Sequence, residues 1–280
     1  MPPELPPRRI DPVERAHLRD AAGFSPPIHR YAPSPGLSDL VRRYWMPVWS
    51  LEPGVVTHQR VLQYPVCLIV VADSYARLVG PQRGLSVQEL RGRGWAMGAM
   101  LQPAAGERLA GGPVQTLTDR FVPLDAAAAL DGPALEHDVR AAVGDEPDDR
   151  DRQAAVVGVF EEHLSRLLPV DDEGLLVNAV VEHVEGDPEV QRVSQLCEKF
   201  ALGERTLQRL TARRIGLSPK WLIQRRRLHE AAERLRSPEP PDLSRVAVDL
   251  GYSDQSHFAR DFRTATGLTP GQYAAEPRPR

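Results

Sequence analysis

One short pattern occurs twice in the last third of the chain, and it constrains the fold more than any other feature. A shift of 51 residues places Gly216-Leu217-Ser218-Pro219 on Gly267-Leu268-Thr269-Pro270. The same shift places Arg209 on Arg260. Self-similarity over a whole stretch at one fixed offset predicts two copies of one supersecondary unit.

The later copy spans residues 243–273 and has the pattern of two helices joined by a tight turn. A stretch with apolar residues at helical spacing stops at Gly251, and a second stretch places Phe258 and Phe262 on one side. A helix that ends at glycine and restarts within about four residues is the helix-turn-helix pattern, whose second helix enters the DNA major groove. Its polar face offers candidate contacts to base edges or phosphates: Gln255, Ser256, His257 and Arg260. The alternative is a structural helix pair with a solvated polar face.

The earlier copy predicts the same unit. Its first helix is expected over residues 193–200, its turn over 201–203 and its second helix over 204–214. Leu207 and Leu210 fall on the inward face of the second helix. The outward face carries Arg205, Gln208 and Arg209.

A single helix is expected between the two copies, over residues 219–236. Proline at its first turn and the lack of an internal breaker favour one continuous element, which the prolines of 237–242 then end. Eighteen residues span roughly 27 Å. Successive major-groove segments on one face of DNA lie about 34 Å apart. A helix of this length, plus the widths of the two units that it joins, could set two reading helices one turn apart. One chain could then read two adjacent major grooves without a partner.

The repeat resembles the C-terminal signature of the AraC family of bacterial transcription regulators. GYSDQSHFARDF and GLTPGQY, from residue 251 to 273, look like its second helix-turn-helix unit, and ERTLQRL and GLSPKWL look like its first. The resemblance covers about residues 175–275 and implies a seven-helix, bipartite DNA-binding domain. It also implies that base readout falls to Arg205, Gln208, Arg209, Gln255, Ser256, His257 and Arg260.

Three positions depart from the family pattern. The family usually has phenylalanine where Thr211 stands, glycine near Ala201 and serine at Gly203. These differences concern the packing and capping of the first unit, so they bear on its stability rather than on its docking to DNA.

The distribution of charge separates the C-terminal third from the rest of the chain. Residues 186–280 hold 17 Lys and Arg against 12 Asp and Glu, while residues 1–185 hold 18 against 26. A basic segment suits a polyanionic partner, and an acidic one does not. At 280 residues the chain is long enough for two domains.

The front part of the chain predicts a different architecture. Residues 1–35 are rich in proline and are expected to be mostly disordered, with a short helix over 11–22. Short strands punctuated by Gly and Pro then suggest a small β-barrel or sandwich, over residues 40–49, 55–61, 66–72, 76–79, 95–101 and 115–122. The aromatic residues of this part either line a small-ligand pocket or fill the core.

Residues 126–130, 135–143, 150–168 and 173–184 carry helical spacing. The expected fold is therefore α+β and multidomain. We expect a Pro-rich segment (1–35), a β-rich sensor-like domain with a helical end (36–170), an all-α bipartite helix-turn-helix domain (171–275) and a tail (276–280). The β-rich part, with LVRRYWMPVW at residues 40–49, is similar to an uncharacterised sensor-like domain found before this DNA-binding module in some regulators.

The sequence does not indicate an enzyme. It lacks a Gly-x-Ser-x-Gly elbow, a phosphate-binding glycine loop with lysine, and zinc-type spacing of His and Cys, so neither a catalytic site nor a metal or cofactor is expected. The alternative is an enzyme that uses the helix-turn-helix module for targeting. Without an apolar run of transmembrane length, and with Cys67 and Cys197 far apart, a cytoplasmic protein without a membrane partner is expected. The expected partners are double-stranded DNA, RNA polymerase, a small-molecule effector and a second copy of the chain.

Overall fold

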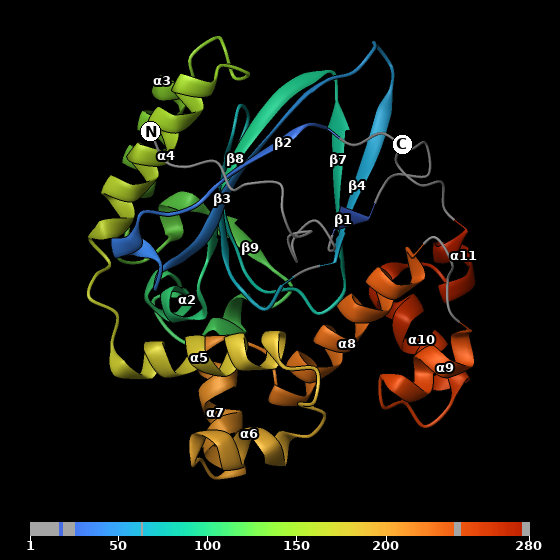
Figure 1. The fold of residues 1–280 in the computed structure, drawn as a ribbon. Coiled ribbons are helices and arrows are strands. Elements are labelled where there is room, and N and C mark those ends of the chain that lie inside the picture. Colours follow the sequence, from blue (N-terminus) through green and yellow to red (C-terminus); the bar gives the residue numbers. More distant parts are fainter. Residues whose placement is uncertain (1–16, 19–25, 63, 238–241, 276–280) are drawn as a thin grey trace.

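Two antiparallel β-sheets lie in the N-terminal half (Figure 1). A computed structural model describes residues 17–18, 26–62, 64–237 and 242–275. One sheet has the strand order β2-β3-β8-β5-β6-β9 and the other β1-β4-β7. The strands are β1 (His17–Leu18), β2 (Ile28–Tyr31), β3 (Val41–Ser50), β4 (Val56–Leu62), β5 (Leu68–Ala72), β6 (Ala76–Val79), β7 (Leu85–Arg91), β8 (Arg93–Leu101) and β9 (Phe121–Pro123). The described strands form two separate sheets and no closed barrel, so the sandwich-like alternative is the one observed.

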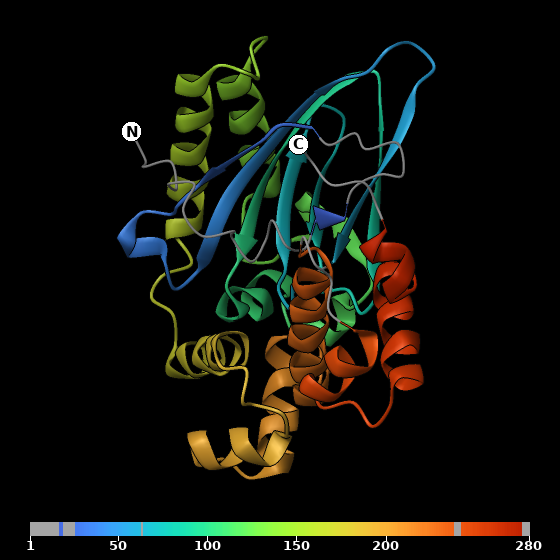
Figure 2. The same cartoon turned by 45° about the vertical axis from the view of Figure 1, so that its right-hand side comes forward.

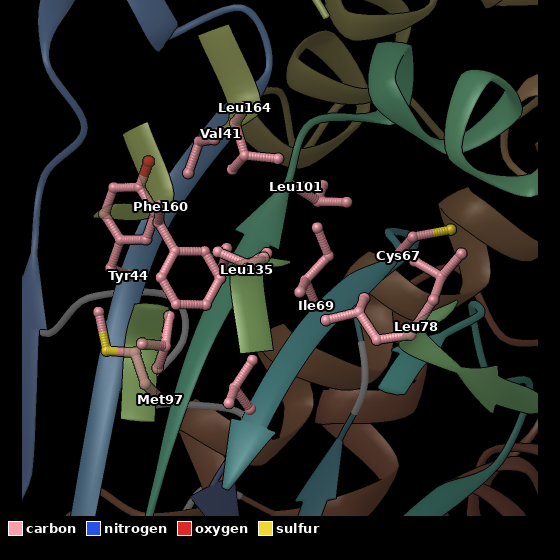
Figure 3. Close-up of a cluster of buried hydrophobic side chains, with 14 of the residues drawn as sticks. Val41, Tyr44, Cys67, Ile69, Leu78, Met97, Leu101, Leu135, Phe160 and Leu164 are labelled. Carbon is pink, nitrogen blue, oxygen red and sulfur yellow. The ribbon is translucent and has the colours of Figure 1, made fainter. Parts of the chain in front are cut away.

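Helices cover one face of the six-stranded sheet. Alternate residues of β3 point to this face because side chains in a strand alternate between its two sides. They pack on α3 (Gly132–Val143) and α4 (Arg150–Ser165), as Figure 3 shows for Tyr44 and Phe160. These two rings lie 5.8 Å apart between centroids in a tilted arrangement. The cluster around them is the main core of the N-terminal half.

On the opposite face of this sheet, tryptophans of β3 lie over glycines of β8. Trp45 pairs with Gly98 and Trp49 with Gly94 in the strand register. A Cβ at Gly98 would meet the Trp45 ring at 2.1 Å, so only glycine lets the indole lie against the strand. The aromatic residues of β3 thus pack within the sheets, with Tyr44 buried on one face and Trp45 half-buried on the other.

The C-terminal third is helical throughout its described part. It consists of α6 (Val193–Phe200), α7 (Glu204–Arg214), α8 (Pro219–Leu235), α9 (Leu243–Asp249), α10 (Gln255–Thr266) and α11 (Pro270–Ala274). Ahead of it, α2 (Pro103–Ala110) and α5 (Asp172–Gly186) lie beneath the sheets (Figure 1). Short 3-10 turns, η1 (Pro35–Leu37), η2 (Val114–Leu117) and η3 (Leu124–Ala126), connect the front elements.

Several expectations for the front half are wrong in detail. Residues 28–31 are a paired strand rather than part of a disordered segment, because they add an edge to β3. The predicted strand over 115–122 is instead η2 followed by β9, and the predicted helix over 126–130 is not formed. The strand β7 and the helix α2 were not predicted. The helix over 11–22 falls mostly outside the described residues, although 17–18 form a strand, and the tail 276–280 lies wholly outside them.

The two halves share one apolar cluster. Leu62 of β4 and Met100 of β8 pack with Leu228 of α8 and with Phe258 and Phe262 of α10. Figures 1 and 2 accordingly show the red helices α9 to α11 beside the ends of β4 and β7. The second helix-turn-helix unit is therefore built onto the sheets and not suspended from a linker.

Candidate DNA-binding surface

The second unit forms because its turn and caps satisfy the helix ends. Gly251, with φ of 73°, follows α9, and Gly267, with φ of 77°, ends α10 in the left-handed region that glycine tolerates. The carboxylate of Asp254 caps α10 by accepting a hydrogen bond of 2.8 Å from the backbone N–H of His257. This bond, and a second from the Ser253 hydroxyl, lower the pKa of Asp254 below its ordinary value. Phe258 and Phe262 are fully buried beneath the helix.

The first unit has the same plan with poorer caps. Ala201 ends α6 with φ of 51° in the left-handed region, where a Cβ costs energy. Gly203 stands at the N-cap of α7 and supplies no side-chain hydrogen bond. Thr211 is fully buried, and its hydroxyl donates to the carbonyl of Gln208 at 3.2 Å. Leu207 and Leu210 are buried as predicted. The first unit therefore lacks glycine at the left-handed position 201 and serine at the N-cap position 203, at or near which the family usually has them.

All the predicted contact residues lie on exposed faces of the two second helices. On α7 these are Arg205, Gln208 and Arg209, and on α10 they are Gln255, Ser256, His257 and Arg260. Each set lies together on its own helix, and the two sets belong to separate units joined by α8. The docking of the second unit on the sheets therefore leaves its polar face open to solvent.

The exposed contact residues differ in how they are held. Within the described part of the chain, Arg205, Arg209 and Arg260 form no ion pair. Gln208 donates to Glu204 at 3.0 Å, and Gln255 accepts from Ser244 at 2.9 Å. Such exposed contacts are easily exchanged for contacts to a ligand.

His257 is more restrained than its neighbours. Its ring meets that of Tyr252 edge-on at 5.3 Å, and its Nε2 lies 3.6 Å from Asp261. The imidazole is thus held against the turn that precedes α10. The arrangement presents one ring edge beside the first turn of the predicted reading helix.

A charged network, which the sequence did not reveal, attaches the first unit to the front half. Arg214, at the end of α7, is buried, and its Nη2 lies 2.5 Å from Asp171 and 2.9 Å from Glu173. Its Nε lies 2.8 Å from Glu107 of α2. Arg213 forms a close ion pair with Glu173 as well. The sequence does not mark Arg213 and Arg214 as members of an ion-pair network, because their acidic partners are distant along the chain.

Three other kinds of feature are relevant to function in the described residues: a metal site, a reactive cysteine and a membrane-spanning helix. No group of three or more His, Cys, Asp or Glu side chains within them could hold a metal ion. Cys67 is buried in the sheet core, and burial raises its pKa to about 12, so its reactive thiolate form is disfavoured. No helix in the described ranges combines the length and apolar content needed to cross a membrane.

Comparison with protein families finds two matches along the chain. Residues 196–276 match a helix-turn-helix domain, and residues 29–123 match a domain of unknown function (DUF6597). The first of these contains α7, α8 and the whole second unit, and the second contains most of both sheets.

Curated relatives and solved structures show similarity to parts of the chain. The virulence regulon transcriptional activator VirF of Yersinia enterocolitica is 27% identical over 125 residues, which are 40% of this chain and 45% of that relative. The HTH-type transcriptional regulator VirS of Mycobacterium tuberculosis is 42% identical over 80 residues, or 29% of this chain and 23% of that one. A crystal structure of a probable AraC family transcriptional regulator from Rhodopseudomonas palustris is 28% identical, with a TM-score of 0.32, and covers 36% of this chain and 94% of its own.

The chain thus spans less than half the length of these curated relatives. The matched range 196–276 contains α7, α10 and the long helix α8 between them. Residues 196–276 are a helix-turn-helix domain of the type found in AraC-family transcription regulators.

Proposed function

We propose that this protein is a sequence-specific DNA-binding transcription regulator that reads two adjacent major grooves. The observation that carries the proposal is the presence of two helix-turn-helix units in one chain, each with an exposed polar face on its second helix. Residues 171–275 form the reading part in this proposal. The contacts to DNA come from Arg205, Gln208, Arg209, Gln255, Ser256, His257 and Arg260.

The arginine and glutamine side chains of the two reading helices can form different contacts to DNA. Arginine can donate two parallel hydrogen bonds to guanine or pair with phosphate, and glutamine can bond adenine. Phosphate contacts fix the register of the protein on the duplex, and contacts to base edges give sequence preference. The cations Arg205, Arg209 and Arg260 are the strongest candidates, because no ion pair within the described residues competes for them.

The front half, residues 36–170 in this proposal, is the sensing part. Its sheets share an apolar cluster with the second unit, and its helix α2 shares a charged network with the first, so a ligand or partner bound to this half can bias DNA binding. A small-molecule effector, RNA polymerase and a second copy of the chain are the partners we propose, in a bacterial cytoplasm. The helix-turn-helix match over residues 196–276 and the similarity of the chain to named transcription regulators favour this role over an enzymatic one.

Selection from a random pool of double-stranded DNA, followed by affinity measurement at fixed salt, tests the proposal. We expect Arg209→Ala and Arg260→Ala each to weaken binding to the selected sequence by about 1–3 kcal/mol, or roughly 5- to 150-fold. Arg166→Ala, an exposed change beyond the end of α4, serves as the control and leaves affinity unchanged. A folded wild-type protein that enriches no sequence from the pool would refute the proposed function.

A further inference from the structure

A groove runs between the two helix-turn-helix units, along one side of α8. It consists of two adjoining hollows of about 350 and 580 Å³. Both hollows include residues that precede α6, residues of α8 and the turn between α9 and α10. The groove therefore touches each reading unit and the helix that joins them. Its basic residues are Arg192, Lys220 and Arg227.

Arg227 connects the two walls of the groove. Its Nη2 donates to the backbone carbonyl of Gln191, just before α6, at 2.9 Å. Its guanidinium lies 5.9 Å from the centre of the Tyr252 ring, in the turn before α10. A Cβ on Gly251 would lie 3.3 Å from the same Nη2, so the turn approaches the arginine closely. Arg227 thus fixes one unit relative to the other at the middle of α8.

The groove has an excess of positive charge that the protein does not neutralise. Within the described residues, Arg192, Lys220 and Arg227 form no ion pair with a carboxylate. Two acids also line the groove, Glu189 and Asp261. The carboxylate of Asp261 is already engaged, because it accepts a hydrogen bond from Gln224 and lies 3.6 Å from His257. Arg192 and Lys220 are exposed and face solvent with their charge available.

The geometry of DNA determines what this groove meets when both units are docked. Two adjacent major-groove segments on one face of a duplex are separated by a minor groove, which is bounded by two sugar-phosphate backbones. A protein surface between two docked reading helices must face those backbones. They carry one negative charge per about 1.7 Å of helix axis. We propose that the groove holds the phosphodiester backbone between the two reading sites, with Arg192 and Lys220 as phosphate contacts and Arg227 as the residue that positions the groove walls.

This inference rests on the proposed DNA-reading function, and it assigns to the groove a contact without sequence preference. The test measures the affinity of the full chain for its selected duplex and for an unrelated duplex over a range of salt concentrations. We expect Arg192→Gln and Lys220→Gln each to weaken binding to both duplexes by the same factor. Each change should also reduce the slope of log affinity against log salt by about 0.9, which is the loss of one phosphate contact. The ratio of specific to unrelated affinity stays constant.

Lys199→Gln is the matched control, because Lys199 is the other lysine of the chain, is exposed, and lies at the far end of α6 from the groove. It should leave the salt slope unchanged. An unchanged slope in both groove variants would overturn the proposal, and so would a loss confined to the selected duplex. A wild-type protein with no sequence preference would instead refute the proposed function itself. A change in transcription with unaltered DNA affinity would mark the groove as a protein contact and would also overturn the proposal.

Discussion

Ala201 has a left-handed backbone conformation, which favours glycine over alanine. Its φ of 51° and ψ of 41° end α6 in the left-handed region, where an L-residue other than glycine is strained by about 1–2 kcal/mol. Part of that strain is offset because alanine restricts the unfolded chain more than glycine does. The first unit therefore forms despite its cap, through the burial of Leu207 and Leu210.

We expect Ala201→Gly to raise the free energy of unfolding by about 0.5–1 kcal/mol, since the relief of strain exceeds the entropy that glycine costs. Urea denaturation of the whole chain measures the change. The control is Ala212→Gly within α7, which should lower stability by about 1 kcal/mol because glycine disfavours a helix interior. Equal destabilisation by both changes would show that position 201 is not strained.

Asp171 links the stability of the first unit to pH. The hydrogen bond from Arg214 holds the pKa of this carboxyl below its ordinary value of 3.8. A carboxyl whose pKa is lower in the folded state adds stability that is complete above its unfolded pKa and is lost as pH falls through the folded pKa. The ion pair with buried Arg214 thus contributes at neutral pH and disappears in acid.

We therefore expect Asp171→Asn to destabilise the protein at neutral pH and to have progressively less effect below about pH 4. Chemical denaturation at a series of pH values gives the difference in unfolding free energy. Asp172→Asn, one residue on and without an ion pair in the described structure, is the comparison and should show little such dependence. A constant difference between wild type and Asp171→Asn across this range would disprove the ion-pair account.

At the scale of elements, the C-terminal helices were predictable because their start and stop signals are strong. The sequence placed α6 and α7 at the bounds the structure has, and α8 within one residue of its end. Apolar spacing, Pro219 at the first turn and glycine at the ends all agree there. Of the five longest strands, only β7 was not predicted. Its apolar-polar alternation ends after Gln88, and Leu85 and Leu90 fall on opposite faces.

The elements that were missed or misplaced lack a local signal. The helix α2 is only 8 residues long and buries mainly small residues such as Ala104, Ala105 and Gly106, with Leu109 as its one large aliphatic side chain. The stretch before β9 was predicted as part of a strand, but residues 114–117 form η2 and Asp119, with φ of 60°, turns the chain. Which residues of α7 and α10 are exposed followed from helical spacing alone. The groove between the units could not be predicted from helical spacing, because Arg227 contacts Gln191 and Tyr252 only in the folded protein.

At the scale of the whole molecule, the sheets and the second reading unit share one core. Leu62 of β4 is fully buried in the cluster that contains Phe258 and Phe262 of α10. These residues are distant in sequence, so no local pattern predicts their contact. A change in the front half can therefore reach a reading helix through packed side chains.

We expect Leu62→Ala to lower the free energy of unfolding by about 2–5 kcal/mol, because it leaves a cavity in the shared cluster. It should also speed amide hydrogen exchange in α10, which packs on the same cluster. Val87→Ala, on the exposed face of the neighbouring strand β7, is the control and should have almost no effect. Faster exchange confined to the strands, with α10 unchanged, would show that the two halves are not coupled through this cluster.

The central claim is that one chain reads two adjacent major grooves. A hydroxyl-radical footprint on the selected duplex, at a protein concentration that gives a single bound molecule, tests it most directly. We predict two protected segments about one helical turn apart on one face of the DNA. Arg209→Ala should weaken one segment and Arg260→Ala the other. A single protected segment, or a second one that forms only when a second molecule binds, would contradict the claim.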